Sequence, residues 1–149
     1  MHTDELIDSE LTSLLLGLLE TAAVLEKRLD RTLSCGRGIS FSEYRLLRAL
    51  MAAPRSTASR VDLAAAVGLT ASAVTRALKP LEKLGIVTTE RSARDARQSL
   101  ASLTPAGAEL LREAHGMLED TLASTPARRF GPRQMETLRT CLAELGARS

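Results

Sequence analysis

Aromatic side chains are nearly missing from this chain: Phe, Tyr and Trp together make up 2% of its 149 residues, and Trp does not occur. Hydrophobic residues nevertheless account for 44% of the sequence, so a core has to be built from leucine, alanine and valine. Leucine and alanine favour helices because they lose little side-chain freedom there. The composition therefore predicts a mainly helical fold, and the length is typical of one domain, residues 1–149.

Cysteine and histidine are also scarce, which limits the chemistry that the chain can carry. Cys35 and Cys141 are far apart, and neither His2 nor His115 lies at ligand spacing from them. This spacing argues against a zinc cluster and against a disulfide scaffold. The sequence also lacks a glycine-rich phosphate loop and a nucleophile–base motif, so we expect no enzyme and no bound cofactor or metal.

Long apolar runs are absent as well. None approaches the roughly 18–20 residues that a membrane span needs. The first residues, Met1–Glu5, lack the basic lead of a secretion signal. We therefore expect a cytoplasmic protein without a membrane partner.

The charge is unevenly distributed, although the net charge is only +2. Residues 1–30 hold seven acids and two bases, a net of −5, and residues 104–149 hold six of each. Residues 31–54 hold four bases and one acid, and residues 55–103 hold eight bases and four acids. A basic centre between acidic or neutral ends is typical of a central nucleic-acid surface, although a solvated face can carry the same charge.

Leucine-rich helical patterns occupy both ends of the chain. From about Asp4 to Leu33, apolar residues recur at steps of three and four, at Ile7, Leu11, Leu14, Leu15, Leu18, Leu19, Ala22, Leu25 and Leu29. Thr104 and Pro105 begin another helix, which ends near Pro126. The last helix, from about Pro132 to Leu145, has an apolar side formed by Met135, Leu138, Cys141, Leu142 and Leu145, in which Cys141 is predicted to be buried. The first stripe fits a surface for a partner, and an ordinary core helix is the alternative.

A short helical segment follows the first helix. Residues 34–38 are predicted to be a loop because of their two glycines. Ser40 and Glu43 then form a capping box, the signature of a helix start. The apolar face of this helix comprises Tyr44, Leu46, Leu47, Leu50 and Met51. Pro54 ends it, and residues 56–59 are predicted to be a connection.

Residues 60–84 have the pattern of a helix-turn-helix. A helix from about Arg60 to Val67 is capped by Ser59 and stopped by Gly68, and Thr70 caps a longer helix from about Ala71 to Leu84. Ala64, Gly68 and Val74 supply the small residue, the turn glycine and the branched residue that two crossing helices need. The inward side comprises Val74, Ala77, Leu78, Leu81 and Leu84, and the outward side comprises Ser72, Thr75, Arg76, Lys79 and Lys83. The outward side of such a helix fits a DNA major groove.

A hairpin is predicted directly after this pair of helices. Residues 86–89 and 98–103 have the composition or alternation of short strands. The segment between them carries Arg91, Arg94 and Arg97 around Asp95. A basic loop on a two-stranded stem can reach a minor groove, whose negative potential attracts arginine. A solvated hairpin tip is the alternative.

Six short motifs follow one another between residues 60 and 107: Leu63-Ala64, Gly68-Leu69-Thr70, Val74-Thr75-Arg76, Leu81 to Val87, Asp95-x-Arg97 and Leu103-Thr104-x-x-Gly107. This succession resembles the MarR family of transcriptional regulators. The resemblance implies a mainly helical winged helix-turn-helix with a small β-hairpin wing, in which residues 40–103 form the DNA-binding lobe. It also implies a homodimer held by residues 1–33 and 104–149.

The resemblance assigns a set of residues to DNA binding. The residues expected at double-stranded DNA are Thr70, Ser72, Thr75, Arg76, Lys79, Arg91, Arg94, Asp95 and Arg97. Two departures affect them, since Thr89 and Ala96 stand where arginine is frequent in the family, so wing contacts are fewer or are carried by Arg91 and Arg94. Pro80 should bend the recognition helix or mark a different helix end. We expect a repressor that binds a palindromic operator.

Family members are often released from DNA by small phenolic or lipophilic ligands, or by cysteine oxidation. A pocket for such an effector would be bordered by Phe41, Tyr44, Arg45 and His115, for which simple packing is the alternative. Cys35, near Arg31 and Arg37, is the candidate redox sensor because nearby cations favour a thiolate. A protein-interaction module that has the same fold without DNA binding is a further alternative.

Overall fold

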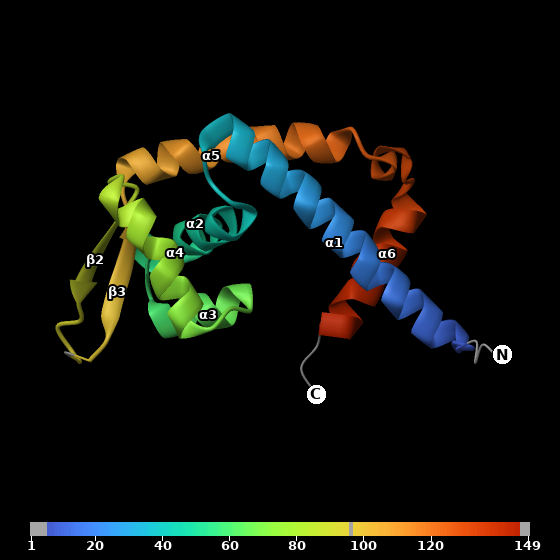
Figure 1. Cartoon of the computed structure of the whole chain (residues 1–149), viewed down its shortest axis with the longest axis horizontal. Coiled ribbons are helices and arrows are strands. Elements are labelled where there is room, and N and C mark those ends of the chain that lie inside the picture. The colour runs from blue at the N-terminus through green and yellow to red at the C-terminus, as the bar shows by residue number, and fades with distance from the viewer. Residues whose placement is uncertain (1–5, 96, 147–149) are drawn as a thin grey trace, which may run out of the picture.

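The computed structural model describes residues 6–95 and 97–146. Figure 1 shows a lobe of short helices and a small sheet at one side, joined along the top by one helix to an arm of two helices at the other side. The elements are α1 (Glu10–Arg37), α2 (Phe41–Ala52), η1 (Pro54–Ser56), β1 (Thr57–Ser59), α3 (Arg60–Val67), α4 (Ala71–Lys83), β2 (Val87–Arg91), β3 (Ser99–Leu103), α5 (Pro105–Ala123), η2 (Pro126–Arg129) and α6 (Pro132–Gly146). The predicted mainly helical fold with a small hairpin is confirmed.

Local side-chain caps begin the helices of the lobe where the sequence predicts them. Ser40, Ser59, Thr70 and Thr104 each accept a hydrogen bond from the backbone N–H three residues ahead. The Ser40 hydroxyl also donates to Glu43 Oε1 at 3.2 Å, so the two residues of the predicted capping box contact each other through their side chains.

The long first helix corrects two predictions. It begins at Glu10 with Ser9 as its cap, and the predicted start at Asp4 lies outside the described residues. The predicted loop at residues 34–38 is wrong, because the helix continues to Arg37 and ends at Gly38, whose φ is +68°. Gly36 lies so close to α5 that a Cβ there would fall 1.7 Å from Met117 Cε. This glycine therefore permits close helix packing and does not break the helix.

The sheet has three strands, in the order β1-β3-β2, and all pairs are antiparallel. The predicted hairpin is β2 and β3, in which Val87 lies opposite Leu103 and Arg91 opposite Ser99. Residues 57–59, predicted to be a connection, instead form β1 and pair with β3, and the Thr57 and Ser102 hydroxyls lie 2.8 Å apart. The sheet thereby attaches the hairpin to the start of α3.

The core lies inside the lobe and under α5. Its fully buried side chains are Leu33, Tyr44, Leu46, Leu47, Leu50, Leu63, Leu78, Leu81, Val74 and Val87. Two residues predicted to face inward are exposed: Met51 is 37% exposed and Leu84 is 69% exposed. Leu84 is the C-cap of α4, so its side chain leaves the buried stripe of that helix.

Candidate nucleic-acid interface

The crossing of α3 and α4 has the geometry predicted for a helix-turn-helix. The two helices are bent by 105° across their short turn, within the range of about 90–120° for this motif. Ala64 and Val74 are buried, and Gly68 adopts a φ of +68° that a side chain would disfavour. No single described helix is long and apolar enough to cross a bilayer, and this bent pair is the one combination that meets those criteria together.

The outward face of α4 presents polar and basic side chains. Ser72, Arg76 and Lys79 are exposed. The Thr70 hydroxyl accepts from the Ala73 N–H, and Thr75 is half-buried with its hydroxyl donating to the Ala71 carbonyl at 3.0 Å. The Thr70 hydroxyl therefore stabilises the start of the helix that carries the exposed residues, and the Thr75 hydroxyl is bonded within the first turns.

Pro80 lies within α4, which continues to Lys83, one residue short of the predicted end. The position of proline therefore does not shorten the recognition helix. At its far end Glu82 Oε1 accepts a hydrogen bond from the Thr89 hydroxyl of β2 at 2.5 Å. Thr89, which departs from the family pattern, thus connects the hairpin to α4.

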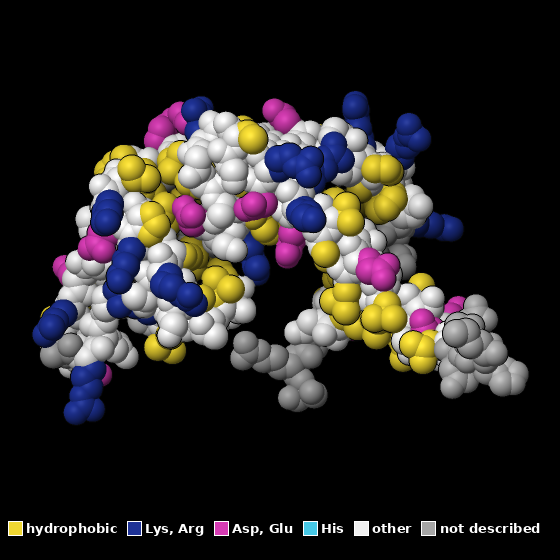
Figure 2. All heavy atoms as spheres, in the orientation of Figure 1, with side chains coloured by type: hydrophobic (Ala, Val, Ile, Leu, Met, Phe, Trp, Pro, Cys, Tyr) yellow, Lys and Arg dark blue, Asp and Glu magenta, His cyan; other side chains and the backbone are white. Residues whose placement is uncertain are grey.

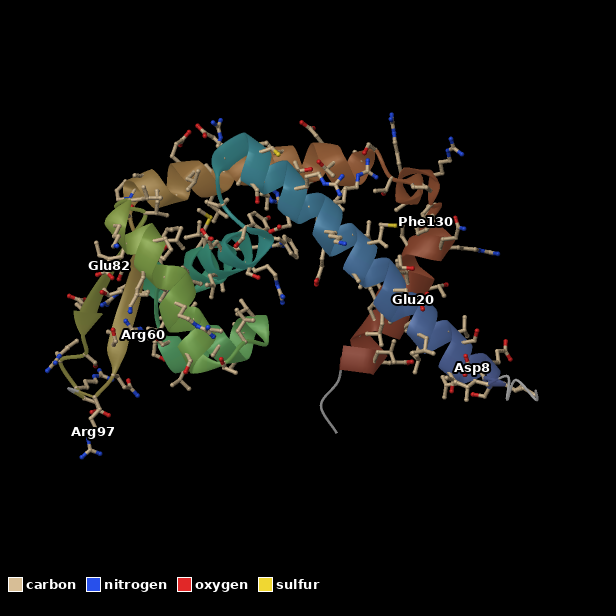
Figure 3. The ribbon with its side chains drawn as sticks, in the orientation of Figure 1. Asp8, Glu20, Arg60, Glu82, Arg97 and Phe130 are labelled. Carbon is tan, nitrogen blue, oxygen red and sulfur yellow. The ribbon has the colours of Figure 1, made fainter. Side chains whose placement is uncertain are left out.

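The tip of the hairpin is ordered by its own side chains. Asp95 Oδ1 accepts from the Arg97 N–H at 2.9 Å, and the Ser92 hydroxyl accepts from the Arg94 N–H at 3.2 Å. Arg91, Arg94 and Arg97 are exposed, and Figure 3 shows Arg97 pointing away from the end of the hairpin. Ala96 lies outside the described residues. Asp95 therefore fixes the turn that carries Arg97.

The basic side chains of the lobe have no acidic partners. The four ion pairs of the described residues are Arg37–Glu113, Arg112–Glu109, His115–Glu119 and Arg139–Glu136. Within the described part of residues 40–103, no lysine or arginine takes part in an ion pair. Figure 2 shows these cations over α4 and along the hairpin. Such a surface is suited to phosphate groups.

Arg60 is a basic residue of this lobe that the sequence prediction missed. It is the first residue of α3, directly after the last residue of β1. Its Nε is the one side-chain polar atom, among the described residues, that is buried without a hydrogen-bond partner. The sequence pattern shows Arg60 only as a helix start, because its position beside the hairpin depends on the pairing of β1 with β3.

The arm exposes the leucine stripes of the two end helices. Leu11, Leu14 and Leu19 of α1 are 65–66% exposed, and α6 has no buried residue. A groove of about 440 Å³ lies between α1 and α6, lined by Leu11, Leu14, Leu15, Leu18, Leu138, Cys141, Leu142, Glu144 and Leu145. Figure 2 shows this apolar surface. Cys141, predicted to be buried, is exposed in this groove, because the apolar side of α6 stays open to solvent along the described helix.

A cavity of about 480 Å³ lies between the lobe and the helices α1 and α5. Phe41, Tyr44 and Arg45 are among its lining residues, together with Leu118 and Leu122 of α5. His115 is not part of this lining. It borders an adjoining cavity of about 300 Å³ that also contains Tyr44 and Arg48.

Tyr44 connects the two cavities. Its hydroxyl lies 2.8 Å from His115 Nδ1, and its ring is stacked with those of Phe41 and His115. Three of the four predicted pocket residues therefore share one cavity, and the fourth contacts it through Tyr44.

Cys35 lies in the last turn of α1 and is exposed. Arg37, one of the two cations expected to favour its thiolate, has its Nε 2.8 Å from Glu113 Oε2 instead. This ion pair directs the positive charge of Arg37 toward α5.

A helix-turn-helix followed by an attached basic hairpin defines the chain as a winged helix-turn-helix protein. Residues 37–98 match the model of the MarR family. Sco3205 of Streptomyces coelicolor, a MarR-family transcriptional regulator solved in complex with DNA, is 29% identical with a TM-score of 0.85, over 95% of this chain and 89% of that one. The chain is therefore similar to the MarR family of transcriptional regulators over residues 37–98, and it shares the fold of a DNA-bound MarR-family regulator over nearly its whole length.

Two further structures share the fold. AbsC, another MarR-family regulator of Streptomyces coelicolor, is 20% identical with a TM-score of 0.82, over 95% of each chain. BpsR of Bordetella bronchiseptica, whose DNA binding is regulated by 6-hydroxynicotinic acid, is 18% identical with a TM-score of 0.78, over 100% of this chain and 99% of that one. No curated protein matches the chain significantly.

Proposed function

We propose that the chain binds duplex DNA sequence-specifically, with α4 in a major groove and the hairpin tip in the neighbouring minor groove. The observation that carries this proposal is the set of unpaired cations on the lobe. Residues 40–103 form the DNA-binding lobe of a single MarR-like domain. A major groove about 12 Å wide admits a helix, and the negative potential of a minor groove attracts arginine.

The residues of this surface have different roles in the proposal. Ser72, Arg76 and Lys79 reach base edges or phosphates, and Thr70 and Thr75 lie at the same end of α4. Arg91, Arg94 and Arg97 carry the contacts of the wing. Asp95 acts by positioning Arg97, because its carboxylate accepts from the backbone N–H of that residue.

We propose that the functional unit is a homodimer held by residues 1–33 and 104–149. The support is the row of exposed leucines on α1 and the complete exposure of α6. A contiguous apolar surface of this kind is typical of a protein–protein interface. A two-fold dimer presents two α4 helices, which predicts a palindromic operator.

Repression by occlusion follows from the same architecture. The described elements form either the lobe or the helices that hold the dimer, so occupancy of DNA is the effect that they can exert on transcription. A duplex site that overlaps a promoter should lower reporter output when the chain is present. A rise in output would contradict repression.

The cavity between the lobe and α5 supports release by a small ligand. Its lining is mainly apolar, with Phe41 and Tyr44 as aromatic surfaces and Arg45 and Arg48 as cations. A small aromatic or lipophilic acid fits this lining, and an aromatic acid regulates DNA binding in BpsR. Calorimetric titration with aromatic carboxylates, compared between the wild type and a variant that combines Arg45→Ala with Arg48→Ala, measures this directly. Equal affinity in the two proteins would remove the proposed site.

The test of DNA binding is a salt titration of the full chain with labelled duplexes. Arg76→Ala should lower affinity for the duplex that the wild type selects from a random-sequence library, with about 1–3 kcal/mol of lost discrimination if Arg76 contacts a base. Arg97→Ala should weaken binding to all duplexes and reduce the salt slope by about one for each bound protomer. Arg129→Ala, in η2 and outside the leucine stripes of α1 and α6, is the control and should leave both quantities unchanged.

The outcome also separates the alternatives. If the wild type fails to bind any duplex at low salt, the chain is a protein-interaction module with a winged-helix fold. If both lobe variants bind as the wild type does, the DNA surface lies elsewhere on the molecule. If mild peroxide changes the affinity of the wild type and not of Cys35→Ser, the chain is a redox-sensing regulator.

A further inference from the structure

The strand register places Arg60 beside the stem of the wing. Ser59, the last residue of β1, lies opposite Leu100 of β3. Arg60 is the next residue and begins α3, so it lies at this end of the β1–β3 pair. On the other edge of β3, Ser99, the residue before Leu100, is paired with Arg91 of β2. Figure 3 shows Arg60 next to β3, on the side of the molecule that carries the wing.

The Arg60 side chain is partly buried while the end of its guanidinium stays accessible. Its Nε is buried without a hydrogen-bond partner, but the residue as a whole is only half-buried. The terminal nitrogens take part in no ion pair of the described residues and are not among the buried unpaired atoms, so they reach solvent. An accessible guanidinium without an acidic partner is suited to a phosphate, because its planar fork can donate two parallel hydrogen bonds.

The local structure gives Arg60 no stabilising role as a charge. It occupies the first turn of α3, where the helix dipole disfavours a cation. Asp62, the acid in the same turn, forms no ion pair with it, and the Asp62 N–H is already bonded to the Ser59 hydroxyl at 3.1 Å. Two positive features, the guanidinium and the helix end, thus coincide where the first helix of the motif meets the wing.

We propose that Arg60 binds a phosphate of the DNA backbone and thereby positions the wing relative to α4. The role rests on the proposed DNA binding. The first helix of a helix-turn-helix crosses the backbone of the duplex while the second lies in the groove. Arg60 is at the end of α3 nearest the hairpin, so its phosphate is one between the major groove that receives α4 and the minor groove that receives the wing.

The phosphate contact of Arg60 contributes to affinity and fixes the position of the protein along the duplex, and it does not recognise a base. Loss of Arg60 therefore weakens binding by a similar factor on every duplex, in contrast to a loss of base contact, which acts mainly on the selected sequence. Lysine at this position retains the charge but not the planar pair of donors, so it restores the salt dependence and only part of the affinity.

The experiment compares the full-length wild type, Arg60→Gln, Arg60→Lys and Arg129→Gln. Arg129 lies in η2, at the opposite end of the molecule from the wing, and controls for net charge (Figure 1). Binding to a mixed-sequence duplex and to the wild-type-selected duplex is measured from about 50 to 200 mM salt. We expect Arg60→Gln to reduce the log–log salt slope by about 0.9 for each bound protomer on both duplexes, and Arg129→Gln to leave it unchanged.

Each outcome of this experiment supports or overturns the proposed role of Arg60. An unchanged slope for a folded Arg60→Gln, or a loss confined to the selected duplex, overturns it. If Arg60→Gln does not fold, Arg60→Met keeps the apolar stem and carries the same measurement. A wild type that binds neither duplex overturns the proposed function as well, whereas a wild type that binds together with an unchanged Arg60→Gln overturns the role of Arg60 alone.

Discussion

Gly107 lies in the first turn of α5, where that helix is attached to the start of β2. A Cβ at this position would fall 2.1 Å from the Ile86 carbonyl oxygen and 2.7 Å from Leu103 Cδ1. The Thr104 hydroxyl also bonds the Gly85 and Ile86 carbonyls here, at 2.6 and 3.0 Å. A backbone carbonyl cannot move aside as a flexible side chain can. Only glycine therefore fits at position 107 while α5 stays in contact with the Ile86 carbonyl.

We expect Gly107→Ala to lower the free energy of unfolding by about 1–3 kcal/mol, as overpacking does. Gly116→Ala is the matched control, since it lies on the same helix and a Cβ there would meet nothing within 4 Å. That control should be neutral or more stable by up to about 1 kcal/mol, because alanine favours a helix. Urea denaturation at one fixed protein concentration measures both. Equal stability of the two variants would contradict the contact.

Single residues also show where sequence reasoning succeeds. The caps at Ser40, Ser59, Thr70 and Thr104 were predictable because a cap depends on three or four adjacent residues. Gly36 was wrongly predicted to lie in a loop, because the contact that accounts for a glycine there is with Met117, which is remote in the sequence. Cys141 was misjudged for the opposite reason, since an apolar stripe was taken as a buried one. Within its own chain Cys141 is exposed, and the proposed dimer would cover it.

At the scale of elements, short strands were the hardest to predict. β1 has three residues without a large apolar side chain, and it exists because β3 supplies its hydrogen bonds. The helices α3, α4 and α5 were predicted to within a residue or two, because their stripes and caps agree. Arg60 lies beside the wing because β1 pairs with β3, and β1 was not predicted from the sequence. For that reason the local sequence pattern did not identify Arg60 as a candidate DNA-binding residue.

The helix α6 is the element that the proposed dimer affects most. It has 15 residues and buries none of them, and an isolated helix of that length is marginal in water. We expect Leu138→Glu combined with Leu142→Glu to raise the dimer dissociation constant by roughly a hundredfold, because burying unpaired charge costs several kcal/mol. Sedimentation equilibrium measures the mass, and circular dichroism measures the accompanying loss of helix.

Thr140→Glu is the matched control for that experiment. It adds a carboxylate to the same helix, at an exposed residue outside the groove between α1 and α6. It should leave the dimer intact. A double variant that stays dimeric would place the interface on another surface, and a wild type that is monomeric at all concentrations would remove the dimer.

At the scale of the whole molecule, α5 connects the lobe that is proposed to bind DNA with the arm that is proposed to form the dimer. This helix of 19 residues begins at the wing and ends next to the arm, packing against α1 and α2 on the way. The Arg37–Glu113 ion pair and the bond from Arg28 Nη2 to the Ser124 hydroxyl, at 2.8 and 2.7 Å, hold α1 to it. The lobe is therefore attached to the proposed dimer interface by a continuous helix rather than by a linker.

A rigid attachment restricts the DNA that a dimer can bind. Two α4 helices held by the arms should contact half-sites about one helical turn apart, roughly 34–36 Å between centres. Inserting about five base pairs between the half-sites turns one of them to the opposite face of the duplex, and inserting about ten restores the face but adds roughly 34 Å. We expect either insertion to reduce affinity to that of one half-site, measured by fluorescence anisotropy. If the insertion of about ten base pairs kept full affinity, the two lobes would be flexibly connected, and a ligand in the cavity beside α5 could not release DNA by changing the separation of the lobes.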